Sequence, residues 1–290
     1  MAAGNTTATA DESTNGIYPY KPNSAICIAV AILFGGSAIY HIFQMIRKKT
    51  WFYTPLVVGS VMMTLGYVAR YFSTKDPSSL MPYIAQSLFI ILPPSLYAAT
   101  LYMIFGRIVI LVDSPKASII RPTRVTKIFV TGDVAAFLLQ SGGGGMMAQE
   151  SMADMGQKVM LGGLFVQLLF FGFFLLVSLI FFKRMRNSPA RHTVPTYGKR
   201  TWVALLKLLF AAAGLIILRC IFRVIEFGQG HSGYLASHEV YMYLFDAFPM
   251  FVVQVMFHVI HAGDVFPPHF AMGKLANDSK DDNIYLQSRG

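Results

Sequence analysis

The chain has 290 residues, of which 54% are hydrophobic and only 13% are charged, and its mean hydropathy is +0.52. Soluble globular proteins carry about 25% charged residues, so this composition indicates a membrane protein and excludes an ordinary soluble enzyme. The formal charge of +10 matters through its placement around a bilayer, and we expect no nucleic-acid partner.

The N-terminal residues 1–22 are polar and lack the basic flank and apolar core of a signal peptide. We interpret them as a disordered extracellular tail. Asn5 stands in an Asn-Thr-Thr sequon, so it is a predicted glycosylation site on that tail.

Residues 23–263 contain seven segments with roughly the 20 apolar residues that a membrane-spanning helix needs. The sequence therefore predicts an all-α membrane protein, a bundle of seven transmembrane helices, followed by a disordered cytosolic tail over residues 264–290. In chain order the expected spans are roughly Ser24–Ile46, Pro55–Phe72, Met81–Val112, Lys127–Ala148, Leu161–Phe182, Val203–Phe227 and Val240–Ala262.

The orientation follows from the lysines and arginines. Sixteen of them fall in alternate connections and in the C-terminal tail, and three fall in the remaining segments outside the spans. Because basic residues accumulate on the cytosolic side, the bias predicts an N-terminus outside the cell and a C-terminus in the cytosol.

Prolines and glycines interrupt several of these segments. Pro93–Pro94 should kink the third span and Pro249 the seventh, because proline removes a backbone donor. The run Gly142–Gly145 should either break the fourth helix or allow a close helix contact.

Charged residues cluster in the outer half of the sixth and seventh spans. Arg219, Arg223 and Glu226 are spaced to share one helical face, and Glu226 can pair with Arg223. Charges inside a membrane are costly, so they should face the bundle and pair. At a similar depth lie Arg70, Glu239 and Asp246. We interpret the six residues as an outward-facing, ligand-binding polar cavity; the alternative is an ion-pair network that only fixes helix packing.

A second polar layer is expected toward the cytosol. Its members are His41, Arg107, Asp133, Gln140, His258 and His261. Three histidines and one aspartate could form a zinc site. No motif of fixed metal-ligand spacing is present, so histidines capped by carbonyl groups or by Asp133 are the preferred interpretation. We expect no metal, no other cofactor and no catalytic residue.

Several motifs are similar to those of one family. They are "GYVAR" at Gly66–Arg70, "LYMIFGRIV" at Leu101–Val109, "GDVAAFLLQSGGGG" at Gly132–Gly145 and "LGGLFVQLLFFGFF" at Leu161–Phe174. The most specific is the block from Leu218 to Asp246, which contains five of the six outer charges. Through these motifs the chain resembles the fungal lipid-translocating exporters named for 7-aminocholesterol resistance. One departure is Met62–Thr64, where members usually carry a glutamate shortly before "GY".

The resemblance implies a plasma-membrane protein that translocates or exports amphipathic lipids or lipophilic toxic compounds. Sphingoid long-chain bases are the favoured ligand, and resistance to sterol derivatives and drugs is the implied outcome. Two other classes stay open, namely a seven-span lipid receptor or sensor and a metal-dependent intramembrane lipid hydrolase. Membrane lipids and an amphipathic small molecule are the expected partners.

Overall fold

The computed structural model describes residues 22–76, 79–112, 122–147, 149–186, 200–230 and 233–266. The expectations for residues 1–21, including the sequon at Asn5, lie outside these ranges, as does most of the expected C-terminal tail.

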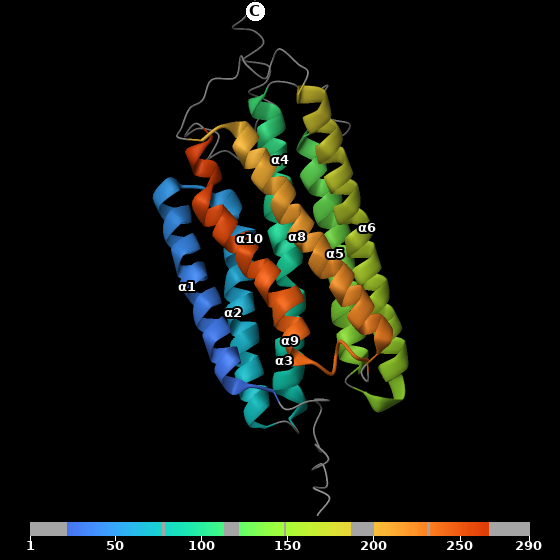
Figure 1. The fold of residues 1–290 in the computed structure, drawn as a ribbon. Coiled ribbons are helices and arrows are strands. Elements are labelled where there is room, and N and C mark those ends of the chain that lie inside the picture. Colours follow the sequence, from blue (N-terminus) through green and yellow to red (C-terminus); the bar gives the residue numbers. More distant parts are fainter. Residues whose placement is uncertain are drawn as a thin grey trace, which may run out of the picture.

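Helices make up the regular structure of the described ranges, which contain no strand (Figure 1). The α-helices are α1 (Ser24–Lys48), α2 (Thr54–Lys75), α3 (Leu80–Ile91), α4 (Pro93–Leu111), α5 (Pro122–Met147), α6 (Ala153–Arg186), α8 (Trp202–Gln229), α9 (Glu239–Met242) and α10 (Phe248–Val259). A π-helical turn, η4 (Tyr243–Ala247), joins α9 to α10. The short 3-10 turns are η1 (Trp51–Tyr53), η3 (Glu150–Met152) and η5 (Ala262–Asp264).

The helices form a bundle of long rods in which α3–α4 and α9–η4–α10 each act as one rod (Figure 1). Contacts between distant residues define its two ends. At the first end, the Asn23 N–H donates to Glu239 Oε2 over 2.9 Å, where α1 and α9 begin. At the second end, Lys48 Nζ lies 2.8 Å from Asp264 Oδ2, where α1 and the last rod finish. We call these the Asn23 end and the Lys48 end.

In the part of the chain that the structure describes, six rods are long and apolar enough to cross a membrane: Ser24–Lys48, Trp51–Lys75, Met81–Leu111, Ala153–Arg186, Trp202–Gln229 and Glu239–Asp264. The expected fourth span corresponds to α5, which is helical but is not one of the six. The chain is therefore a multi-pass helical membrane protein, while a seventh crossing by α5 and the orientation stay predictions.

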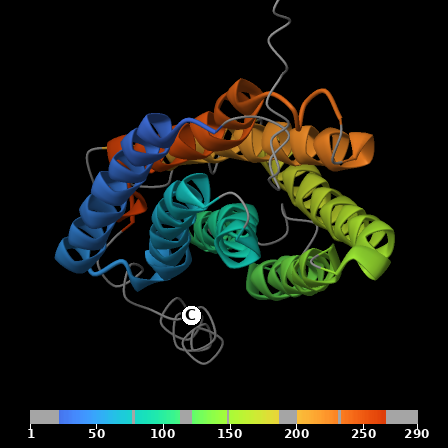
Figure 2. The same cartoon turned by 90° about the horizontal axis from the view of Figure 1, so that it is seen from below.

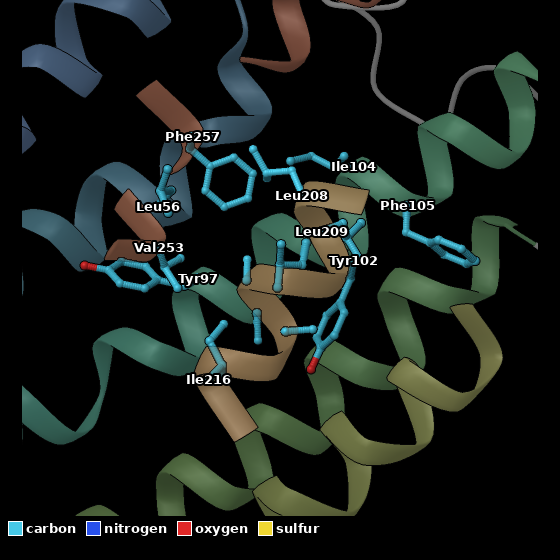
Figure 3. Close-up of a cluster of buried hydrophobic side chains, with 14 of the residues drawn as sticks. Leu56, Tyr97, Tyr102, Ile104, Phe105, Leu208, Leu209, Ile216, Val253 and Phe257 are labelled. Atoms are coloured by element: carbon cyan, nitrogen blue, oxygen red, sulfur yellow. The ribbon is translucent and has the colours of Figure 1, made fainter. Parts of the chain in front are cut away.

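The central helix is α4, the second part of the third rod, and most of its residues are buried. It packs against α2, α5, α6 and α8, and Figure 2 shows it enclosed by the other rods. Tyr102 and Phe105 of α4 belong to the same apolar core as Leu209 of α8 and Phe257 of α10 (Figure 3). This core fixes the position of α8, which carries three of the predicted outer charges.

Both proline predictions correspond to local breaks in the rods. The third rod divides between Ile91 and Pro93, and α4 begins with prolines at its first positions, where a missing N–H costs least. In the last rod, the π-helical turn η4 comes immediately before the α10 segment that contains Pro249. Both breaks lie next to the charged cluster described below.

The glycine run does not break α5, which continues to Met147. Instead it permits close packing of α5 on α6. A Cβ atom on Gly143 would lie 2.6 Å from the Met160 backbone nitrogen and 2.7 Å from the Gly156 carbonyl oxygen. Of the two predicted outcomes, close helix contact is the one observed.

Candidate functional site

Asp246 is the centre of the charged cluster. It lies in η4 and is fully buried, and its carboxylate contacts the guanidinium groups of Arg219 and Arg223 from α8. Pro249 lacks the N–H that would bond to the Phe245 carbonyl one turn earlier, and the helix before it has a π-helical turn. Asp246 lies in this turn, and its side chain faces α8.

Arg223 joins the cluster to Glu226. Its NH2 group contacts Asp246, and its NH1 group donates to Glu226 Oε2 over 2.8 Å. The pairing of Arg223 with Glu226, predicted from their spacing of three residues, is thus confirmed. Among the described residues, no donor approaches the other oxygen of Glu226, Oε1.

Arg219 joins the cluster to the broken third rod. Besides contacting Asp246, it donates a hydrogen bond of 2.7 Å from NH2 to the Ile90 carbonyl oxygen. Ile90 lies four residues before Pro94, so its carbonyl has lost the backbone donor that an unbroken helix would supply. A guanidinium offers several donors in a fixed plane, which lets one side chain satisfy both acceptors.

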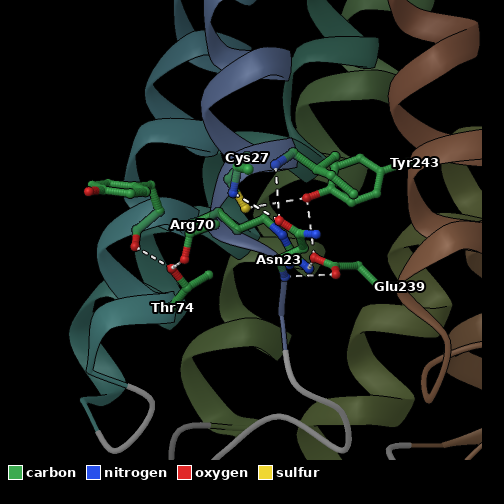
Figure 4. Close-up of polar contacts among 10 residues, drawn as sticks. Asn23, Cys27, Arg70, Thr74, Glu239 and Tyr243 are labelled. Atoms are coloured by element: carbon green, nitrogen blue, oxygen red, sulfur yellow. Dashed lines mark hydrogen bonds and ion pairs between the residues drawn. The ribbon is translucent and has the colours of Figure 1, made fainter.

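A second ion pair lies at the Asn23 end (Figure 4). Arg70 NH2 donates to Glu239 Oε1 over 2.9 Å, and the Tyr243 hydroxyl donates to the same oxygen over 3.2 Å. Arg70 also lies over the Tyr243 ring, with 5.8 Å from its guanidinium carbon to the ring centroid. The six outer charges therefore form two groups: Arg70 with Glu239, and Arg219, Arg223 and Glu226 with Asp246.

Two adjoining cavities lie beside these groups. The smaller, about 120 Å³, has a charged wall that includes Arg70, Arg223 and Glu226. The larger, about 350 Å³, is lined mainly by apolar side chains such as Ile84, Leu88 and Met160. The two share a wall, formed by Tyr83, Ser87, Ile91, Met147, Gln157 and Phe227. Asp246 lines neither of them, so its contacts are internal, whereas Glu226 faces the smaller cavity.

The residues of the shared wall were not singled out in the sequence. Gln157 Nε2 donates to the Phe227 carbonyl over 2.6 Å and so joins the start of α6 to the last turn of α8. This part of α6 precedes the expected fifth span, Leu161–Phe182. The span was placed by its apolar length, which locates the membrane-embedded part of a helix and not its ends. The position of Gln157, one helical turn before that span, was the only sequence feature that could have indicated its role.

The inner polar residues occupy several separate places. The rings of His41 and His258 stack with centroids 3.9 Å apart, and the Ser37 hydroxyl lies 2.9 Å from His258 Nε2. His261 instead stacks on Tyr53 at 4.2 Å, and its Nδ1 accepts from the Gly263 N–H over 3.1 Å. A backbone N–H, not Asp133, therefore caps His261.

The remaining three lie apart from the histidines. Arg107 stacks over Phe52 at 4.3 Å, and Gln140 Nε2 donates to Gln167 Oε1 over 2.8 Å. Asp133 is buried beside the Tyr102 hydroxyl. The expectation of one shared layer is thus not met. In the part of the chain that the structure describes, no three His, Cys, Asp or Glu side chains are grouped so as to hold a metal ion.

Comparison with known proteins identifies the class. The family model described as "RTA1 like protein" matches residues 56–269, so the chain belongs to the RTA1-like family of membrane proteins. Among the similar proteins is Protein RTA1 of Saccharomyces cerevisiae, 40% identical over 207 residues, which cover 71% of this chain and 64% of that protein. The chain thus spans slightly less than two thirds of that relative's length.

Other relatives carry functional names. Protoporphyrin uptake protein 1 of Saccharomyces cerevisiae is 38% identical over 74% of this chain and 70% of its own length. The sphingoid long-chain base transporter RSB1 of Saccharomyces cerevisiae is 21% identical over 88% of this chain and 75% of its own length. These names describe uptake or transport proteins. No solved structure matches the chain.

Proposed function

We propose that this protein translocates amphipathic lipids across a membrane and that a long-chain base with a cationic headgroup is its favoured ligand. The observation that carries the proposal is the pair of adjoining cavities, one with a charged wall and one mainly apolar, with a common wall. An amphipathic molecule has the matching division into a polar head and an apolar chain.

The headgroup contact falls to Glu226. This carboxylate lines the smaller cavity and is only half-buried, and its Oε1 atom has no donor among the described residues. An ammonium group can therefore bind Oε1 while Arg223 keeps Oε2. Since Arg223 also contacts Asp246, a cation that displaced it from Glu226 would leave it with another carboxylate.

The apolar chain would occupy the larger cavity. Its volume of about 350 Å³ lies within the range of roughly 300–1,000 Å³ that is usual for ligand sites. The two cavities adjoin at Ile91 and Phe227, so a single molecule that occupied both would pass between these side chains.

Under this proposal, the protein lies in the plasma membrane, where it would give resistance to lipophilic toxic compounds. With the N-terminus outside, as the basic residues predict, the Asn23 end faces the exterior. Arg70 and Glu239, which pair at that end, would then lie near the outer surface, and the smaller cavity that Arg70 lines would lie in the outer half of the bundle. Removal of lipophilic toxic compounds from the plasma membrane, and resistance to them, would follow. The name of the relative described as a sphingoid long-chain base transporter supports a translocator in preference to an enzyme.

A flip assay in vesicles tests the proposal. Purified protein is reconstituted with a fluorescent sphingoid base, and movement between leaflets is measured by quenching of the outer leaflet. We expect wild-type protein to accelerate movement relative to empty vesicles. Glu226→Gln should weaken the response by at least about tenfold, because a hydrogen bond to a charged group contributes about 1.5–3 kcal/mol.

Controls separate the other two classes. Asp76→Asn changes an exposed acid that lines neither cavity and should behave as wild type. Saturable binding without leaflet movement would favour the sensor. Cleaved lipid in the recovered vesicles would favour the hydrolase.

A further inference from the structure

Asp133 has no role in the site described above, yet its surroundings are unusual for an acid. It lies on α5 and is only 4% exposed. Its one polar neighbour among the described residues is the Tyr102 hydroxyl, and no basic residue in those ranges forms an ion pair with it. Buried charges are normally paired, so a buried acid without a charged partner calls for an explanation.

Among the described residues, the titratable groups near Asp133 are uncharged ones. From α4 the Tyr102 hydroxyl lies beside its carboxyl group. From α8 the nearby titratable group is the buried thiol of Cys220. From α6, Phe170 lies against Gly132, the residue before Asp133, and Phe174 packs on the Tyr102 ring. An ionised carboxylate would be an isolated charge in this apolar surrounding, whereas a protonated carboxyl would be neutral and could donate to Tyr102.

Asp133 lies close to Cys220 of α8, the helix that carries the arginines of the charged cluster. Cys220 follows Arg219 in α8, and Arg219 contacts Asp246. Asp133 on α5 and Asp246 on η4 therefore lie near consecutive residues of α8. Asp246 is compensated by two arginines and Asp133 by none. A shift of α8 that exposed Asp133 to water or to Arg219 would stabilise its carboxylate.

We propose that Asp133 is a proton-binding site that couples lipid movement to proton movement across the membrane. The carboxylate takes up one proton from water on one side and forms the neutral acid of the present conformation. It releases that proton to water on the other side when α8 shifts. No electron is transferred and no other bond changes. This inference rests on the proposed lipid translocation.

Two measurements test it. The first needs no lipid transport: infrared spectroscopy of the purified protein detects the carbonyl band of a protonated carboxylic acid. We expect a band in wild type that is absent from Asp133→Asn, a variant that keeps the shape of the neutral acid. An identical spectrum in the variant would show that Asp133 carries no proton, and that result would overturn the proposal whether or not the protein moves lipid.

The second measurement uses vesicles that contain a fluorescent sphingoid base and a pH difference of one unit. Protein-free vesicles set the baseline, because a long-chain amine redistributes toward the acidic side unaided. One proton per lipid would shift the leaflet ratio by about tenfold beyond that baseline. Asp133→Asn should still equilibrate the lipid without a gradient but lose the additional shift, whereas Asp264→Asn, a change at the Lys48 end, should keep it.

The outcomes are distinct for the two proposals. Wild-type protein that moves no lipid even without a gradient would contradict the translocator function, and the infrared result would still decide proton binding. Wild-type protein that equilibrates lipid but shows no additional shift, or a variant that retains the shift, would refute the coupling.

Discussion

Arg219 donates to the carbonyl oxygen that Pro94 leaves without a backbone partner, since Ile90 lies one helical turn before that proline. The same guanidinium contacts Asp246 in the π-helical turn before Pro249. One side chain on α8 therefore joins two proline-interrupted rods, and this gives it a structural role that pairing with an acid alone would not.

The first prediction concerns this link. Arg219→Leu should lower the free energy of unfolding by about 3–5 kcal/mol, because removing one member of a buried ion pair leaves a poorly compensated charge. Pro94→Ala would restore an N–H opposite Ile90. In the Arg219→Leu background it should therefore recover about 1 kcal/mol, the net contribution of one hydrogen bond. Thermal unfolding in detergent of wild type, the two single variants and the double variant measures the coupling between Arg219 and Pro94. Strictly additive effects of the two substitutions would contradict the link.

The second prediction concerns Asp246 and Arg223. Asp246→Asn leaves two buried guanidinium groups with less compensation and should destabilise the protein by about 3–5 kcal/mol. Adding Arg223→Gln removes one of those less compensated charges, so the double variant should lose less stability than the sum of the two single losses. Fluorescence-detected size-exclusion chromatography after heating ranks the variants. If the double variant is no more stable than the sum of the two single losses predicts, Asp246 and Arg223 do not compensate each other's charge.

The third prediction concerns the contact between α5 and α6. Gly143→Ala should lower the free energy of unfolding by about 1–3 kcal/mol, since its Cβ would press on the Met160 and Gly156 backbone. Gly142→Ala is the matched control, because nothing lies within 4 Å of a Cβ there. Alanine favours a helix by up to about 1 kcal/mol over glycine, so the control should be neutral or stabilising. Equal losses in both variants would count against close backbone packing.

The fourth prediction concerns orientation. Asn5 should carry a glycan and the sequon at Asn277 should not, because the basic residues place the first outside and the second in the cytosol. Glycosidase treatment followed by gel mobility, with Asn5→Gln and Asn277→Gln as controls, measures both sites. A glycan on Asn277 would reverse the orientation and place the Asn23 end in the cytosol.

The sequence predicted the outer charges more accurately than the inner polar residues, for physical reasons. The Arg223–Glu226 pair depends only on helical spacing, and the contact of Arg219 with Asp246 follows from the need of buried charges to pair at a matching depth. Few acids were available to the arginines at that level. The acceptor at Ile90 could not be predicted as easily, since any backbone carbonyl is a candidate.

The inner residues show what spacing cannot determine. Asp133 and Gln140 are seven residues apart and so share a face of α5. Even so, Asp133 lies beside Tyr102 on α4, whereas Gln140 donates to Gln167 on α6. Which neighbour a helix face meets depends on helix rotation and on packing at glycines such as Gly163, whose Cβ would lie 2.8 Å from the Gln140 side chain. A sequence pattern assigns depth and face but not the neighbouring helix.

The glycine contact between α5 and α6 also bears on how the chain enters a bilayer. By length and composition, each of the other long rods of the described ranges could cross a membrane, whereas α5 is not among them. Its backbone lies against that of α6, which is long and strongly apolar. A marginal helix can be retained in lipid when a partner already in place offers close backbone packing. We therefore expect α5 to be committed to the membrane only after α6 has been synthesised, as a helical hairpin. Ribosome-bound chains that end before residue 153 should leave α5 accessible to water, and chains that extend past residue 186 should not.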